Sequence, residues 1–582
     1  MPQEFSRLAR LFATVAGFAV LAACGGGGGG LGGGNNTGGQ NGGNNGGNNG
    51  ATVTVSGRVT FDRFDFQPTT GAGLNAANPI ESPAREVVVQ AVYGGSTTST
   101  TTNANGEYTL TVAASTNMII RARAQMQKTG SAPTWNFAVR DNTDADAVYV
   151  LDTVSFNSGT ANVTNKDLKA PSDWNGSGYN AGRRAAPFAI LDTVYDAKQL
   201  ILSAASTAQI PELNLYWSED NRPSTTFCPD QGNIGTSFYA VGQRDQCTTN
   251  GAALPDGIYI LGDYQTDTDE YDSHVIAHEF GHFFEDRFSR SDSIGGQHGL
   301  GDLLDLRVAF GEGWGNAFGS MALNDPQYRD SHSGISQDFG FNLETGDASN
   351  VQGWFSEASV GEFLWDVFDS ANAAEPSDNV SLGFTEIYGA MTDTQVTATD
   401  ALTSIFSFAK ALRAQGGVTA SAINGLLSQH DIANADEFGS TESNDGSDPT
   451  VLPIYRDIVR NMPVAGVCSN STAGSKDQGE EVIPNKLGNH RFFRFVNDAR
   501  RLVTITAQGA VAGGGTVAAT DPEIYVIRQG NAVLVGDVTG GGVETLDQRQ
   551  LDAGTYIIDV FDYDTAGVNQ PPRCMTLSIT GP

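Results

Sequence analysis

The sequence predicts a multidomain protein in which a central α+β, mostly helical domain is flanked by two β-sandwiches. Residues 52–125 alternate apolar and polar side chains in short runs separated by Gly, Asn and Thr, the period of strands. Apolar residues then recur at helical spacing in several segments between 187 and 429, and strand-like alternation returns after Cys468. A chain of 582 residues has room for three or four domains of about 150 residues each.

The charge balance is strongly acidic, with 66 Asp and Glu residues against 33 Lys and Arg residues and a formal net charge of −33. Such a field repels nucleic acids and anionic lipid surfaces, so we expect neither as a partner of the folded domains. An acidic surface favours solubility, and Asp-rich loops also hold Ca²⁺ in some proteins; the sequence leaves both explanations open.

Residues 1–24 have the pattern of an export signal. Arg7 and Arg10 precede an apolar run over 11–21, and the segment ends in Leu-Ala-Ala-Cys at Cys24. This ending resembles the lipobox of bacterial lipoproteins, which implies lipidation of Cys24. With Gly25 following, it also implies an outer-membrane lipoprotein of a two-membrane bacterium, facing the periplasm or the exterior. A plain signal peptide with an incidental Cys is the alternative.

Residues 25–50 are almost entirely Gly and Asn, a composition that builds no core and predicts a flexible tether. After it, strands are expected at Thr52–Thr60, Arg85–Tyr93, Glu107–Val112 and Met118–Ala124. The runs Ser56–Thr60 and Asn105–Leu110 resemble the carboxypeptidase-regulatory-like β-sandwich. The resemblance implies an accessory domain over 51–125.

The central domain is expected over residues 126–465. We predict a strand at Ile258–Leu261 and helices at Pro187–Leu202, Val308–Ala322, Val360–Asp369, Asp400–Ala414 and Ala420–Gln429. An Asp- and Thr-rich loop follows the strand. Residues 126–250 match no known pattern, which leaves room for a propeptide.

The C-terminal domain is expected over residues 466–582. Strands are predicted at Phe492–Val496, Leu502–Thr506, Glu523–Ile527, Val533–Val535 and Thr555–Phe561. The runs Asp521–Val526 and Ala553–Val560 resemble the bacterial pre-peptidase C-terminal domain. The resemblance implies an accessory β-sandwich of the kind attached to secreted proteases.

Four cysteines remain once Cys24 is set aside, and an even count in an exported chain favours two disulfides. Three pairings are possible in principle. Cys228 and Cys247 are close in sequence, and Cys468 and Cys574 bracket one β region, so we expect these two pairs. A Cys-rich zinc site is the alternative, although the chain contains no C-x-x-C.

The segment His278–His282 reads His-Glu-Phe-Gly-His, an H-E-x-x-H motif. Residues four apart share a helix face, so both imidazoles can reach one metal ion. Zn²⁺ suits nitrogen ligands, and a catalytic site keeps one position open for a water that Glu279 is placed to deprotonate. His274 extends the row, but three His along one straight helix cannot converge on one ion. A surface or core helix with incidental histidines is the alternative.

A catalytic zinc needs a third protein ligand. Glu285 and Phe288 stand where metzincins have Gly and His, which excludes that class. His298, in a turn-like Gly-Gly-Gln-His-Gly, is one candidate for the third ligand. We favour Glu312, which lies thirty residues after His282 in Gly-Glu-Gly-Trp.

The segment around Glu312 repeats Gly every four residues, at Gly311, Gly315 and Gly319. Each Gly destabilises a helix by roughly 1 kcal/mol against Ala, so the stripe predicts that another backbone passes close by. The helix that carries the H-E-x-x-H motif is the expected neighbour. Asn316, one turn after Glu312, is placed to hydrogen-bond a ligand imidazole.

The H-E-x-x-H motif with a distant Gly-Glu-Gly-Trp resembles the gluzincins, the thermolysin clan, and most of all the fungalysin-type metallopeptidases. The resemblance implies one catalytic zinc on His278, His282 and Glu312, with Glu279 as general base and Asn316 holding a ligand His. It also implies an endopeptidase that cuts polypeptides in the middle. The strand Ile258–Leu261 is the expected edge for the substrate backbone.

One stretch departs from the family pattern. Fungalysin-like enzymes place a His before a later Gly-Glu helix, whereas Ser356–Trp365 contains none. Tyr388 and His332 are the candidates for the group that stabilises the oxyanion. The sequence thus predicts an exported, lipid-anchored zinc metalloendopeptidase. An inactive surface-binding lipoprotein and a zinc hydrolase of a non-peptide bond are the alternatives.

Overall fold

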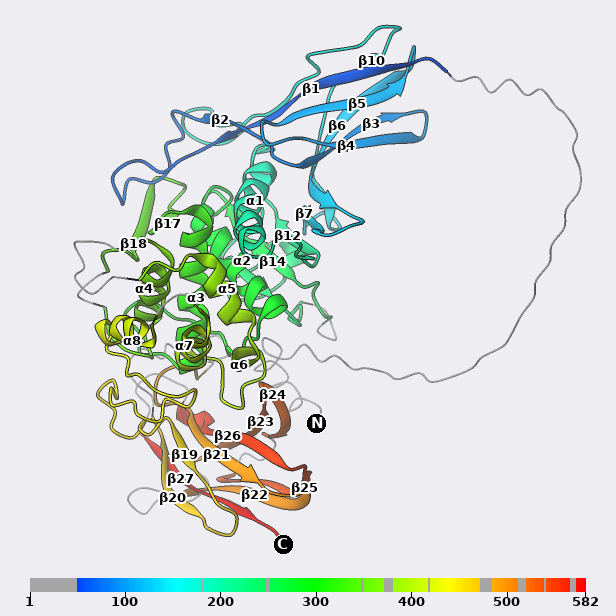
Figure 1. The fold of residues 1–582 in the computed structure, drawn as a ribbon. Coiled ribbons are helices and arrows are strands. Elements are labelled where there is room, and N and C mark those ends of the chain that lie inside the picture. Colours follow the sequence, from blue (N-terminus) through cyan, green and yellow to red (C-terminus); the bar gives the residue numbers. More distant parts are fainter. Residues whose placement is uncertain are drawn as a thin grey trace, which may run out of the picture.

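The computed structural model describes residues 50–180, 182–247, 252–346, 350–370, 380–416, 419–470, 484–510, 520–537, 541–565 and 572–582. The expected export signal, the lipobox at Cys24 and the tether up to residue 49 lie outside the described residues. The described chain forms an N-terminal β region, a central region in which the helices gather, and a C-terminal sandwich, following one another along the molecule (Figure 1).

The N-terminal region begins with a four-stranded sheet in which β1 is central. It contains β1 (Thr52–Arg63), β2 (Ile80–Pro83), β5 (Glu107–Ala113) and β11 (Leu168–Ala170). Every second residue of β5 is buried, as the period of a strand with one face on a core requires. The expected strands of this region are therefore present.

A ten-stranded sheet runs from the N-terminal region into the central one. Its main path, in order, is β13 (Phe238–Ala240), β14 (Gly257–Ile260), β12 (Leu213–Trp217), β7 (Trp135–Asp141), β6 (Asn117–Lys128), β3 (Val87–Tyr93) and β4 (Ser96–Thr101). The short strands β8 (Ala147–Val148), β9 (Val150–Asp152) and β10 (Phe156–Asn157) pair beside β7 and β6. The expected domain boundary at 125/126 falls inside β6, so the two regions share this sheet.

The strand expected to receive substrate is not an edge strand. β14 pairs in parallel with β12 on one side and antiparallel with β13 on the other. Since both of its sides are occupied, the expectation that Ile258–Leu261 supplies an edge is wrong. The edge is β13, a three-residue strand too short for its sequence period to be recognised.

The helices are α1 (Ala186–Ala204), α2 (Ser273–Phe288), α3 (Leu306–Leu323), α4 (Glu357–Phe368), α5 (Phe384–Thr392), α6 (Thr394–Thr397), α7 (Ile405–Ala414) and α8 (Ala420–Gln429). Two small hairpins accompany them: β15 (Gly262–Asp263) with β16 (Asp267–Thr268), and β17 (Gln327–His332) with β18 (Gln337–Asn342). The expected helices are all present, although α7 begins at Ile405 rather than at Asp400.

The expectation of a mostly helical catalytic domain is nevertheless wrong. Of the residues that the structure describes, 21% are in helices and 36% in strands. Residues 126–272 supply β7 to β16, several of them only two to five residues long, separated by turns. Runs of that length show neither a clear strand period nor a clear helix period, and their pairing with distant strands decides their structure.

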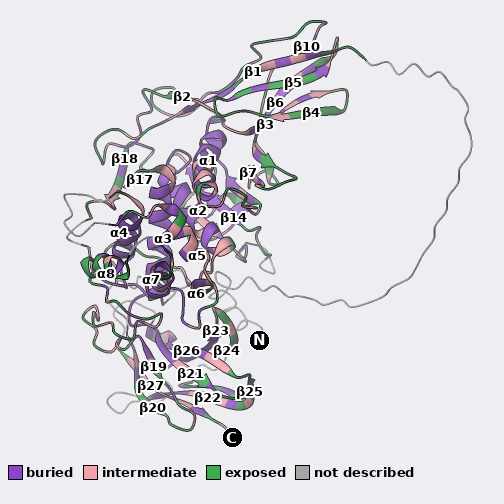
Figure 2. Cartoon of the chain, in the orientation of Figure 1, coloured by how far each residue is buried: buried purple, intermediate pink, exposed green. Residues whose placement is uncertain are grey.

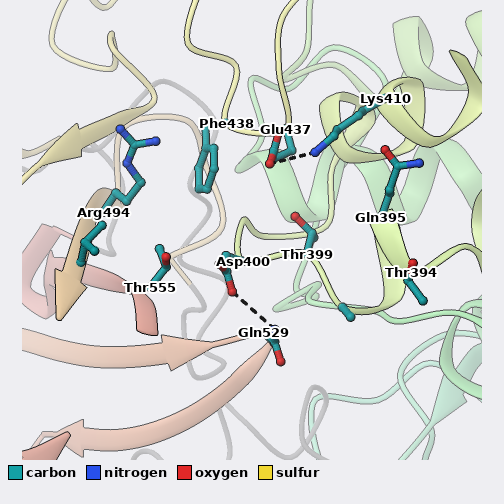
Figure 3. A pocket seen from close by; sticks show the side chains of 12 residues that line it. Thr394, Gln395, Thr399, Asp400, Lys410, Glu437, Phe438, Arg494, Gln529 and Thr555 are labelled. Atoms are coloured by element: carbon teal, nitrogen blue, oxygen red, sulfur yellow. Dashed lines mark hydrogen bonds and ion pairs between the residues drawn. The ribbon is translucent and has the colours of Figure 1, made fainter. Parts of the chain in front are cut away.

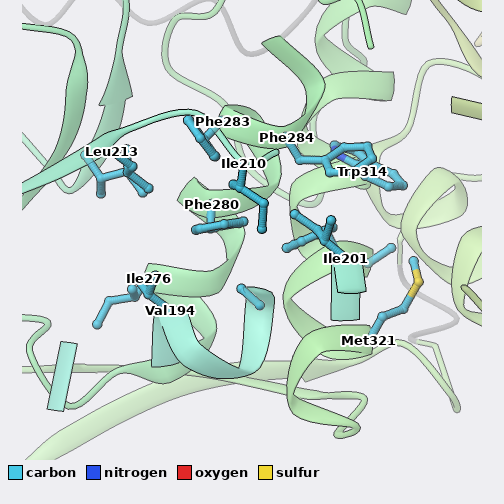
Figure 4. Packing of buried hydrophobic residues seen from close by; sticks show 14 of the residues in the cluster. Val194, Ile201, Ile210, Leu213, Ile276, Phe280, Phe283, Phe284, Trp314 and Met321 are labelled. Atoms are coloured by element: carbon cyan, nitrogen blue, oxygen red, sulfur yellow. The ribbon is translucent and has the colours of Figure 1, made fainter. Parts of the chain in front are cut away.

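The core of the central region forms where α1 and α2 pack against the large sheet and α3 packs against both of these helices. Val194 and Ile201 of α1 meet Phe280 and Phe284 of α2 and Trp314 of α3 (Figure 4). Figure 2 shows α2 and α3 as largely buried helices. Burying each such side chain stabilises the fold by about 1.5–3 kcal/mol, so this core holds α2 and α3 firmly together.

The C-terminal sandwich has its own core between two sheets. One sheet has the order β19 (Tyr455–Asp457), β21 (Arg491–Asn497), β26 (Gly554–Asp562), β23 (Pro522–Arg528), β24 (Asn531–Gly536). The other has the order β20 (Val464–Ser469), β27 (Arg573–Thr580), β22 (Arg501–Ala510), β25 (Val543–Leu551). The expected boundary at 465/466 falls inside β20.

The two expected disulfides are confirmed. Cys228 is bonded to Cys247, and Cys468 to Cys574. The second bond joins directly opposed residues of β20 and β27. Within the described ranges, no helix is both long enough and apolar enough to cross a membrane.

Candidate metal centre

Two buried helices bring the H-E-x-x-H motif and Glu312 together. His278 and His282 are one turn apart on α2, and their Nε2 atoms lie 3.0 Å from each other. Oε2 of Glu312, on α3, lies 3.3 Å from Nε2 of His278 and 3.4 Å from Nε2 of His282. Ligand atoms held tetrahedrally at about 2.0–2.1 Å from one Zn²⁺ are roughly 3.4 Å apart, so these residues fit one zinc ion.

Asn316 contacts a candidate ligand, as its spacing from Glu312 suggests. Its Oδ1 lies 2.8 Å from Nδ1 of His278. An amide oxygen accepts a hydrogen bond, so Nδ1 carries the proton and Nε2 keeps a lone pair directed at the centre. This contact sets both the tautomer and the ring orientation of His278.

The glycine stripe of α3 lies against α2. A Cβ atom on Gly315 would lie 2.7 Å from Cε1 of the His278 ring, and one on Gly281 would lie 3.1 Å from Cα of Gly315. Gly319 faces the backbone of His274 and His278. The close crossing that the sequence predicts is therefore present, and it leaves no room for a side chain beside the His278 imidazole.

Glu279 links the centre to the edge of the large sheet. Tyr239, on β13, donates its backbone N–H to Oε2 of Glu279 at 2.7 Å. Burial raises the pKa of Glu279, while the charges of His278 and His282 oppose that rise. The carboxyl group thus lies beside both the candidate ligands and β13, an edge strand of the large sheet.

His298 also reaches the centre. Its Nε2 lies 3.2 Å from Oε2 of Glu312, and its Nδ1 lies 3.1 Å from Oε2 of Glu357 on α4. The two candidates for the third ligand are therefore neighbours. Glu357 carries no sequence signal, because its role depends on α4 packing beside α3.

The charges of the centre compensate one another. Burial acts to raise the pKa of Glu312, but the charges of His298 and His282 hold it well below its usual range. Burial acts to lower the pKa of His282, and Glu312 outweighs it, raising that pKa to about 9. The three imidazoles thus surround a carboxylate that is ionised, the form that binds a cation.

The two residues considered for the oxyanion lie elsewhere. The Tyr388 ring, on α5, packs edge-on against Phe284 with centroids 5.7 Å apart. His332, at the end of β17, contacts Oγ of its neighbour Ser333 at 3.0 Å. In the described part of the chain, neither side chain hydrogen-bonds to the centre. His274 is also turned away, with Nε2 3.1 Å from the carbonyl oxygen of Asp325.

A separate cavity of about 390 Å³ lies between the α6–α7 segment and the C-terminal sandwich. Lys410 and Glu437 form an ion pair of 2.9 Å at its wall, and Asp400 accepts a hydrogen bond from Gln529 across it (Figure 3). None of the residues that line it belongs to the metal centre.

No protein-family model and no curated protein matches the chain. Among solved structures, the pre-peptidase C-terminal domain of a collagenase from Bacillus anthracis is 12% identical, covers 22% of this chain and 93% of that domain, and has a TM-score of 0.15. A periplasmic inhibitor of g-type lysozyme from Aeromonas hydrophila is 14% identical, covers 22% of this chain and 95% of its own, and has a TM-score of 0.13. The comparisons thus support only a weak likeness to a pre-peptidase C-terminal domain, and none of them supports a gluzincin peptidase.

Proposed function

We propose that the protein is a zinc metallopeptidase in which His278, His282 and Glu312 hold one zinc ion and Glu279 is the general base. The observation that carries the proposal is the spacing of the three ligand atoms, 3.0–3.4 Å, between two buried helices. A bound Zn²⁺ would polarise a peptide carbonyl and lower the pKa of a water molecule towards 7. The proton transfers and the stabilisation of the oxyanion are carried out by side chains of the protein.

Glu279 accepts the proton of the attacking water and returns it to the leaving amine. The N–H of Tyr239, 2.7 Å from Oε2, holds one carboxylate oxygen in place so that the other is free to act. His298 is the best-placed donor to the developing oxyanion, because Glu357 holds its Nδ1 and its Nε2 points to Glu312. In this proposal His298 stabilises the oxyanion, the role for which the sequence suggested Tyr388 and His332.

The geometry favours an extended polypeptide as substrate. β13 is the edge of the large sheet, and Tyr239 directs its N–H away from β14, towards Glu279. A peptide laid along β13 would pass directly beside the base, with the N–H of Tyr239 already donated to Glu279. Such binding depends on the substrate backbone rather than on its side chains, as expected of an endopeptidase with broad sequence specificity.

We also propose that the enzyme is exported and anchored in the cell envelope through lipidated Cys24. The support is the residue pattern alone: two Arg residues, an apolar run and the lipobox-like ending. The Gly- and Asn-rich residues 25–50 would let the folded domains reach substrates around the anchor.

The test combines zinc quantitation with casein hydrolysis on the purified protein and its Glu279→Gln variant. We expect about one zinc per chain in both, and a loss of about 10²–10⁴-fold in hydrolysis in the variant. A wild-type chain that holds zinc but cleaves no peptide would favour hydrolysis of a non-peptide bond. A chain that binds no zinc would contradict the proposal and favour an inactive, surface-binding lipoprotein.

A further inference from the structure

Four aspartates gather beside the start of α2; we call Asp267, Asp269, Asp272 and Asp330 the aspartate cluster. Asp267 is on β16, Asp269 follows it, Asp272 is the last residue before α2, and Asp330 is on β17. One carboxylate oxygen from each of Asp267, Asp269 and Asp330 lies within 4.8 Å of the other two. The charge of Asp330 also acts on Asp272.

Two of these carboxylates are buried and only half hydrogen-bonded. Asp269 is 3% exposed, and its Oδ2 accepts from Oγ of Ser237. Asp272 is 0% exposed, and its Oδ2 accepts from the N–H and the hydroxyl of Ser331, both at 2.8 Å. The other oxygen of each, Oδ1, is buried and has no hydrogen-bond partner. Buried polar atoms are almost always satisfied, so Oδ1 of Asp269, which belongs to the group of three close carboxylates, indicates a ligand there.

In the described part of the chain, no Lys or Arg forms an ion pair with the aspartate cluster. Two arginines close to these elements are engaged elsewhere: Arg329, next to Asp330 in sequence, pairs with Asp338 at 2.7 Å, and Arg183 pairs with Glu270 at 2.8 Å. A group of carboxylates in a poorly solvated position repels itself unless a cation or protons neutralise it.

The electrostatic environment reflects this repulsion. Burial raises the pKa of Asp269 and Asp272 well above the usual range, and the charge of Asp330 raises both further. Burial, with the charge of Asp267, raises the pKa of Asp330 to about 8. His332 acts in the opposite direction on Asp267, whose pKa burial nevertheless raises to about 6. A divalent cation would neutralise the group without protons.

We propose that the aspartate cluster binds one Ca²⁺ ion. The donors that gather there are carboxylate oxygens, with the hydroxyl of Ser237 beside them, which is the ligand chemistry of Ca²⁺ rather than of zinc. Ca²⁺–O bonds of about 2.3–2.6 Å place opposite ligand atoms roughly 4.6–5.2 Å apart, so oxygens within 4.8 Å fit around one ion. Mg²⁺ is smaller and usually keeps several of its waters, which suits a group of closely spaced carboxylates less well.

The ion would join three elements that no disulfide links: the β15–β16 hairpin, the start of α2, and the β17–β18 hairpin. Asp272 directly precedes α2 and lies six residues before His278, which is on that helix. Calcium binding at the aspartate cluster is therefore expected to stabilise the segment from which α2 extends to the metal centre.

The experiment uses the mature chain with its zinc in place, freed of calcium, in a background of excess Mg²⁺. Calcium is titrated by calorimetry, and thermal unfolding is followed with and without it. We expect about one Ca²⁺ per chain and a higher Tm with calcium, because the ion binds the folded state. Asp330→Asn should weaken calcium binding at least about tenfold and abolish the rise in Tm.

Without calcium, the Asp330→Asn variant should melt no lower than the wild type, because the amide removes one repelling charge. The control is Asp263→Asn, on the neighbouring strand β15 and outside the cluster, which should bind calcium as the wild type does. If Asp330→Asn does not fold, Asp267→Asn takes its place, because it removes another carboxylate of the same close group. A wild type that binds no calcium, or a cluster variant that binds it normally, overturns the proposal. Neither readout depends on hydrolysis.

Discussion

Arg307 and Asp559 form a buried ion pair that joins α3 to the C-terminal sandwich. Nη1 of Arg307 lies 3.1 Å from Oδ2 of Asp559, and the two side chains are 2% and 1% exposed. Asp305, the N-cap of α3, contacts the same guanidinium, and Nδ1 of His490 lies 2.8 Å from Oδ1 of Asp559. Glu312 follows Arg307 by little more than one helical turn. The sandwich is therefore tied to the helix that carries a candidate zinc ligand.

We expect Asp559→Ala to lower the free energy of unfolding by about 3 kcal/mol, because it removes one of the two carboxylates that pair with the buried Arg307 and also the hydrogen-bond partner of His490. Urea unfolding measures the change. The matched control is Asp457→Ala, which breaks the more exposed pair with Arg494 on the same sandwich and should change stability by about 0–1 kcal/mol. If both substitutions lowered the free energy of unfolding by the same amount, the Arg307–Asp559 pair would not contribute more than an exposed pair, and the prediction would be wrong.

Gly315→Ala should reduce zinc content and hydrolysis, although Ala is the better helix former. The new Cβ atom would lie 2.7 Å from the His278 ring, so the ring or the helix must move. Gly425→Ala is the control, because Gly425 lies within α8 with nothing within 4 Å of the added atom. That change should stabilise the protein by up to about 1 kcal/mol and leave zinc in place. Normal zinc content in Gly315→Ala would mean that the crossing of α2 and α3 tolerates a side chain.

Glu312→Ala should lose most of the bound zinc, since it removes the carboxylate that contacts both His278 and His282. His298→Ala should keep the zinc and lose mainly kcat, as expected for a group that acts on the oxyanion. Zinc quantitation and steady-state kinetics on both variants separate the two roles. The opposite pattern, zinc kept in Glu312→Ala and lost in His298→Ala, would make His298 the third ligand.

Cys24→Ala should release the protein from the membrane fraction while leaving folding and hydrolysis unchanged. The two or three acyl chains of a lipoprotein make an anchor durable, and the substitution removes the attachment point. Fractionation after a high-salt wash measures the outcome. A variant that stays with the membrane would show that the folded domains hold it there.

The sequence by itself determined the features that depend on neighbouring residues. His278 and His282 share a face because helix geometry repeats every three to four residues, and the strands of the N-terminal β region and of the C-terminal sandwich follow from alternation. The glycine repeat at Gly315 predicted the close crossing of α2 and α3, because such a repeat destabilises a helix unless a neighbour uses the space. The favoured disulfide pairs also followed, from their spacing along the chain.

Only the tertiary structure decided the features that depend on residues far apart in the chain. Three of them form only after several elements have packed together. They are the contact between His298 and Glu357, the place of β13 at the sheet edge, and the Arg307–Asp559 pair. The same holds for the balance of strand over helix, because short strands are stabilised by pairing with distant partners rather than by their own period. Local patterns report the conformation of a segment, whereas which segments lie side by side is set by the burial of the whole core.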